Sequence, residues 1–100
     1  MNSPERVEQA LKTAKASLPP EVVDLRHELD IDSTGVDCVR VWLILDDASP
    51  EEVWAFASTS AMRETVKRAL RDAEVDLWPY ILVRAKSEQD AFDAEAAVGR

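Results

Sequence analysis

Two stretches of alternating residues, separated by a short polar segment, constrain the fold of this chain more than any other feature. In residues 22–31 one set of alternate positions is mostly apolar and the other is charged; the first set is Val23, Leu25, His27, Leu29 and Ile31. Residues 38–45 alternate too, with Val39, Val41, Leu43 and Leu45 on one face. A period of two is that of a strand with one buried face. Because residues 32–37 are a turn by composition, the strands are predicted to form an antiparallel hairpin. Arg40 should pair with Glu28 or Asp30 on its polar face.

Helical signals lie on both sides of this hairpin. Ser3 and Pro4 predict the start of a helix over residues 4–17, and Pro19-Pro20 ends it. Further along, Ser49-Pro50-Glu51-Glu52 has the spacing of a capping box, in which Ser49 caps and Glu52 reaches back.

The helix after this capping box has two apolar stripes on nearly opposite sides. The first is Val53, Phe56 and Ala57, and the second is Met62, Val66, Ala69, Leu70 and Ala73. Residues 58–60, Ser-Thr-Ser, lie between them and favour helix ends over interiors. We expect a kink or a break into two helices near residues 58–60, with one continuous helix buried on two sides as the alternative.

A third strand is predicted over residues 77–86. Pro79 limits its hydrogen bonding and places it at a sheet edge or at the strand's start. The predicted fold is a single α+β domain of order α-β-β-α(α)-β, a three-stranded sheet with helices on one face. Its core spans about residues 3–86, and residues 87–100 form an acidic tail that is either a short helix or without fixed structure.

Composition limits the classes of partner. The net charge of −8 repels phosphate backbones, favours basic partners and serves solubility. The single cysteine, Cys38, excludes an internal disulfide and suits a reducing compartment. We see neither a signal peptide nor an apolar run long enough to cross a bilayer, and so predict a cytoplasmic protein that does not bind membranes.

Four features that could indicate a catalytic, metal or nucleic-acid site have simpler interpretations. Asp30-Ile31-Asp32-Ser33-Thr34 spells the DxDxT motif of haloacid dehalogenase-like phosphatases, but that fold needs a longer chain and further motifs, so we interpret it as a hairpin turn. It also resembles the start of an EF-hand loop, whose twelfth position would be Val41 instead of glutamate.

His27 and Cys38 are lone residues without a visible activating partner, and His27 should be packed in the core. We therefore predict no catalytic residue, metal site or cofactor, and no enzyme activity.

A basic stripe on the long helix is the fourth such feature. Its members are Arg63, Lys67, Arg68 and Arg71, and Glu64 could pair with Arg68. A solvated helix face is the simpler interpretation, and nucleic-acid contact is the alternative.

The most informative set of residues is aromatic. If the helices cover the Val39–Leu43 face, the opposite face presents Trp42, Ile44, Trp78, Tyr80 and Leu82. Large aromatic residues on an uncovered sheet face are typical of a contact surface. We predict that these five residues bind another protein or a second copy of this chain, unless the tail or the first helix covers them.

Parts of the chain resemble a group of short, uncharacterised bacterial proteins. The matching pieces are Asp32-Ser33-Thr34-Gly35 with Val39, Val41 and Trp42, then Trp78-Pro79-Tyr80-Ile81 with Arg84, and Ser87-Glu88. Members of the group often have a proline where this chain has Val36-Asp37-Cys38. The resemblance implies a shared fold and no particular activity. Small acidic proteins of this kind look like accessory or antitoxin-type partners in toxin or defence operons.

The sequence thus favours a non-enzymatic, acidic protein-interaction module. The alternative is a degenerate nucleic-acid module, because the order of elements is similar to that of a type II KH domain. Residues 58–61 stand where such a domain has its GxxG loop, which is absent. A third hypothesis is a small enzyme or ligand binder that uses His27 and nearby acids.

Overall fold

The computed structural model describes residues 4–98, which form seven elements in the predicted α+β order. These are α1 (Pro4–Ala16), β1 (Val22–Ile31), β2 (Asp37–Leu45), α2 (Glu51–Trp54), α3 (Phe56–Asp72), β3 (Trp78–Ala85) and α4 (Lys86–Val98). None of the described helices is long and apolar enough to span a membrane.

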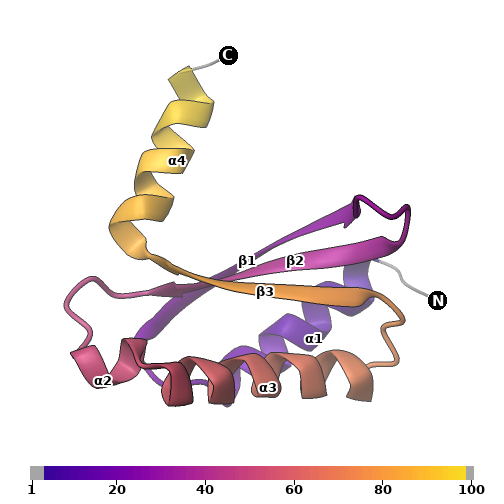
Figure 1. The fold of residues 1–100 in the computed structure, drawn as a ribbon, viewed down its shortest axis with the longest axis horizontal. Coiled ribbons are helices and arrows are strands. Elements are labelled where there is room, and N and C mark those ends of the chain that lie inside the picture. The colour runs from indigo at the N-terminus through magenta and orange to yellow at the C-terminus, as the bar shows by residue number, and fades with distance from the viewer. Residues whose placement is uncertain (1–3, 99–100) are drawn as a thin grey trace.

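The three strands form one mixed sheet with β2 in the centre. β1 pairs antiparallel with β2, which confirms the hairpin, and β3 pairs parallel with β2 on its other side. The parallel arrangement requires a crossover, and α2 and α3 provide it on one face of the sheet (Figure 1). Pro79 lies at the second position of β3, an edge strand, as its missing N–H requires.

The core lies between this sheet and the helices α1 and α3. Alternate residues of β2, Val39, Val41 and Leu43, are fully buried. They pack in one cluster with Val7, Ala10, Leu11 and Ala14 of α1 and with Met62, Val66 and Leu70 of α3. Burial of each large side chain contributes roughly 1.5–3 kcal/mol, so this cluster determines which sheet face is inside.

The start of β1 departs from simple alternation. The register between β1 and β2 shifts between Val22 and Asp24, which is a β-bulge. Val22 is therefore buried opposite Leu45, whereas Val23 is exposed. The assignment of Val23 to the buried face was wrong, because alternation alone cannot show an extra residue in a strand.

The capping box predicted at Ser49 is not formed. Pro50 is the residue that precedes α2, and no side chain caps this helix. The hydroxyl of Ser49 is buried without a hydrogen-bond partner. The indole of Trp54 instead donates to the Ser49 carbonyl over 3.3 Å. This contact holds the α2 turn against the loop that precedes it.

The long helical region is broken, but at Ala55 and not at residues 58–60. Ala55 has an extended backbone, with φ −62° and ψ 151°, and separates α2 from α3. Residues 58–60 lie inside the first turns of α3, where the Thr59 hydroxyl donates to the Ala55 and Phe56 carbonyls. The break changes the phase of the helix. Met62, Val66 and Leu70 therefore face the core, while Phe56 is 82% exposed.

The acidic tail is helical through Val98. This helix, α4, follows β3 directly and projects away from the sheet on the side opposite α1 and α3 (Figure 1). The sheet face on that side, which we call the open face, is therefore bordered by α4 at one end.

Candidate interaction surface

The register of the sheet brings the sequence-predicted surface residues onto the open face. Trp42 of β2 lies beside Leu82 of β3, and Arg40 lies beside Tyr80. Trp78 and Ile44 share this face because they occupy alternate positions of the same strands. The side chains meet across neighbouring strands as the alternation predicts.

The five predicted residues differ in how much surface they offer. Trp78 is 61% exposed, Leu82 45% and Tyr80 39%. Trp42 is half-buried and Ile44 is fully buried. Trp78, Tyr80 and Leu82 are therefore the side chains available for contact, whereas Ile44 offers no surface.

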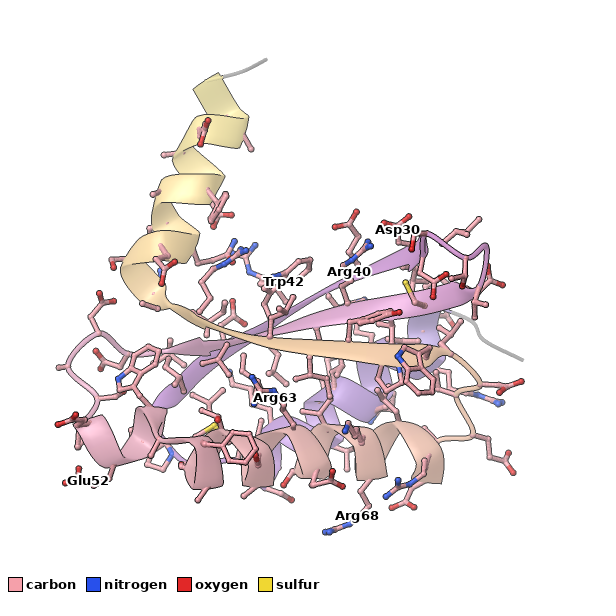
Figure 2. All side chains as sticks on the ribbon, in the orientation of Figure 1. Asp30, Arg40, Trp42, Glu52, Arg63 and Arg68 are labelled. Atoms are coloured by element: carbon pink, nitrogen blue, oxygen red, sulfur yellow. The ribbon has the colours of Figure 1, made fainter. Side chains whose placement is uncertain are left out.

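Arg84 connects the open face to α4. Its guanidinium carbon lies 5.3 Å from the centre of the Trp42 ring and 4.2 Å from that of Phe92, so the cation contacts both aromatic rings. Arg84 Nη1 also donates to Gln89 Oε1 over 2.9 Å. Figure 2 shows Trp42 on this face, near the base of α4.

A second arginine fixes the direction of α4. Arg26 of β1 donates from Nη2 to Asp93 Oδ2 over 2.9 Å and from Nε to Asp24 Oδ2 over 3.0 Å. Gln89 Nε2 donates to the other oxygen of Asp93 over 2.9 Å. The hydrogen bond from Gln89, followed by the charge of Arg26, lowers the pKa of Asp93. Both interactions stabilise α4 where it leaves the sheet.

The start of α4 is also fastened to the loop after β2. The Ser87 backbone N–H donates to Asp47 Oδ1 over 2.8 Å, and the Ser87 hydroxyl donates to the other oxygen of Asp47. These bonds lower the pKa of Asp47. A short helix was one of the two alternatives for residues 87–100, but the contacts of Ser87 with Asp47 and of Asp93 with Arg26 join segments 40 and 67 positions apart, so no local pattern predicts them.

The far end of the open face contains an ion pair and a turn. Arg40 pairs with Asp30, which confirms the expected cross-strand contact (Figure 2). In the turn, Asp32 Oδ1 accepts hydrogen bonds from the Thr34 hydroxyl and from the Thr34 and Val36 backbone N–H groups. Asp32 and Thr34 of the phosphatase-like motif therefore have a structural role here.

His27 is exposed, so its predicted place in the packed core was wrong. β1 is an edge strand, and apart from Val23 its exposed residues run from Arg26 to Ile31. Cys38, by contrast, is a fully buried thiol. Within residues 4–98 no group of three or more histidine, cysteine or carboxylate side chains could hold a metal ion.

The predicted basic stripe is divided between two roles. Arg63 turns inward and donates from Nε to the Ile81 carbonyl over 3.1 Å and from Nη1 to the Thr59 hydroxyl over 3.4 Å (Figure 2). Glu64 pairs with Lys67 at 3.6 Å instead of with Arg68. Arg68 and Arg71 remain exposed near the end of α3.

Comparisons with protein-family models, with curated proteins and with solved structures give no match to this chain.

Proposed function

We propose that this protein is a non-enzymatic interaction module whose open face binds another protein. Its closest functional analogy is the antitoxin-type or accessory partner in a bacterial toxin or defence operon, which neutralises a second protein by covering it. The observation that carries the proposal is the exposed group of Trp78, Tyr80 and Leu82 on adjacent positions of one strand face. Tyrosine and tryptophan are enriched at the centres of protein interfaces.

Charges around this group indicate what kind of partner fits. The arginines of the open face are engaged within the chain: Arg26 and Arg40 in ion pairs, and Arg84 on two aromatic rings. The whole chain has a net charge of −8. A partner with an apolar centre and with basic groups that meet the acidic parts of this chain would match it and would associate faster at low salt.

The test is capture of the partner by wild-type protein and by two aromatic variants. Trp78→Ala removes an exposed ring from the open face, and Phe56→Ala removes a ring that is even more exposed from α3 on the other layer. Proteins retained from the native cell are identified by mass spectrometry, and the purified partner is then titrated against each variant. We expect Trp78→Ala to weaken binding by about tenfold or more and Phe56→Ala to leave it unchanged.

Equal binding by all three proteins would show that the open face is not the contact surface. Circular dichroism of each variant provides the control for folding, because neither ring belongs to the buried cluster.

Nucleic-acid binding in the manner of a KH domain is supported less well. The order of elements agrees with that of the type II KH domain, and Arg68 and Arg71 are exposed. The connection between α2 and α3, however, is the single residue Ala55, which leaves no loop to hold a phosphate backbone. Salt-dependent RNA binding in a gel shift would favour this alternative.

A further inference from the structure

The outer half of α4 has almost no surface to pack against in a single copy. The contacts that hold this helix come from Ser87, Gln89, Phe92 and Asp93. Beyond Asp93, every side chain from Ala94 to Ala97 is exposed. Helices of about 12–15 residues are marginal in water unless a face is packed, and α4 has 13 residues. Its outer half would gain stability from a partner surface.

A groove of suitable chemistry lies at the opposite end of β3. It has a volume of about 280 Å³ and is lined by residues from the end of α3, the following loop and the start of β3: Lys67, Leu70, Arg71, Val75, Leu77, Trp78 and Pro79. We call it the α3–β3 groove. It has an apolar floor and two cations, Arg71 and Lys67, the second of which also pairs with Glu64 at 3.6 Å. Trp78 belongs both to this groove and to the open face, so the two surfaces are continuous.

The charges of α4 and of the groove are complementary. The helix contains four carboxylates against one lysine; Asp90 pairs with Lys86 and Asp93 with Arg26, whereas Glu95 lies in the exposed outer half among small apolar alanines. The groove is lined by the first residues of β3, and α4 begins where β3 ends (Figure 1). Eight residues of strand separate the two by roughly 26 Å. Because α4 also points away from the sheet, it cannot reach the groove of its own chain.

We propose that two copies of this chain associate about a two-fold axis, with their open faces together and their strands antiparallel, and that each α4 packs in the α3–β3 groove of the other copy. This inference rests on the proposed function, since it takes the open face as a protein-binding surface and names a second copy as the occupant. Glu95 then lies against Arg71 and Lys67, and the alanines lie against Leu77 and Trp78.

The dimensions of the elements allow this arrangement. Stacked sheets lie about 10 Å apart, and 13 helical residues extend about 20 Å. The outer half of α4 therefore passes the sheet of the other copy and reaches its helix layer, where the groove lies. The antiparallel orientation places the end of one β3 beside the start of the other, so both contacts form at once.

Charge reversal with mixing tests the reciprocal contact. Sedimentation equilibrium of the wild type should show a dimer. Arg71→Glu and Glu95→Arg should each raise the dissociation constant by roughly tenfold or more, because each creates two like-charge contacts. A mixture of the two variants should restore association, since both contacts of the mixed dimer again join opposite charges. Arg68→Glu changes a neighbouring exposed arginine that does not line the groove and should have little effect.

Failure of the mixture to restore association would overturn this contact, as would a wild type that stays monomeric at the highest soluble concentration. A monomer that still captures a partner through Trp78 would leave the proposed function intact. A folded Trp78→Ala protein that still binds its partner and still forms a dimer would overturn both the two-fold arrangement and the proposed function. Circular dichroism melts of the variants establish that they are folded.

Discussion

Tyr80 donates a hydrogen bond from its hydroxyl to Asp32 Oδ2 over 3.2 Å and so connects β3 to the turn between β1 and β2. The other oxygen of Asp32 accepts three bonds from Thr34 and Val36 inside the turn. One carboxylate therefore organises the hairpin turn and joins it to the aromatic side of the open face. Because these bonds favour the charged form, led by the Thr34 hydroxyl, the pKa of Asp32 is lowered to about 2.

Asp32→Asn should reduce the acid sensitivity of the fold. The folded pKa is about 2, below the roughly 3.9 of an unfolded aspartate. The stabilisation from Asp32 is therefore fully present above about pH 5 and is lost as the pH falls through its folded pKa. Urea unfolding at several pH values should show a smaller loss of stability toward about pH 2 in the variant than in the wild type. An identical loss would contradict the role assigned to this carboxylate. Some acid sensitivity should remain, because the pKa values of Asp30, Asp47 and Asp93 are also lowered.

Ser49→Ala should leave the free energy of unfolding unchanged or raise it by up to about 1 kcal/mol. The Ser49 hydroxyl is buried without a partner, and removal of an unsatisfied polar group relieves its desolvation cost. If Ser49 capped the helix, the same change would instead lower the free energy of unfolding by about 0.5–2 kcal/mol. Denaturant unfolding distinguishes the two results. Thr59→Ala is the matched control: its hydroxyl makes bonds to Ala55 and Phe56, so it should lose about 1 kcal/mol.

The elements that could be predicted from sequence are those with a strong local pattern. β1 begins and ends where the alternation does, and the turn at Asp32 follows from its composition. The predictions failed where tertiary contacts determine the local structure or the burial of a residue. The bulge at Val23 follows from pairing with β2. His27 is exposed although it lines a hollow with Leu11 and Lys12 of α1, and periodicity cannot show how completely a neighbouring helix covers an edge strand.

The candidate surface could be predicted only in part, because some of it follows from a local pattern and some of it depends on tertiary contacts. Pleating places Trp42, Trp78 and Tyr80 on one face once two strands are recognised. The parallel pairing that brings them together depends on the crossover. The contacts of α4 with Arg26 and with Asp47 could not be predicted, because they join segments 67 and 40 positions apart. The break at Ala55 was missed because alanine favours helix and gives no local signal for an end.

Arg63→Ala should lose about 1–3 kcal/mol of stability, whereas Arg68→Ala should change it by less than about 0.5 kcal/mol. Arg63 donates to the Ile81 carbonyl and to Thr59 between α3 and β3, so its loss leaves acceptors without a partner. Arg68 is exposed on the same helix. Thermal or denaturant unfolding of both variants gives the comparison. Equal effects would show that Arg63 belongs to a solvated stripe after all.

Leu43→Ala and Leu82→Ala together determine which face of the sheet is the core. Leu43 is fully buried among the residues of α1 and α3, while Leu82 is 45% exposed on the open face. Removing the Leu43 side chain leaves a cavity and should lower the free energy of unfolding by about 2–5 kcal/mol. Leu82→Ala should lower it by less than about 1 kcal/mol in the monomer, because much of this side chain is already in water. The same change should weaken association through the open face. Denaturant melts at low protein concentration, paired with sedimentation at high concentration, separate the two effects. A large loss of monomer stability in Leu82→Ala with unchanged association would show that the open face is covered within one copy.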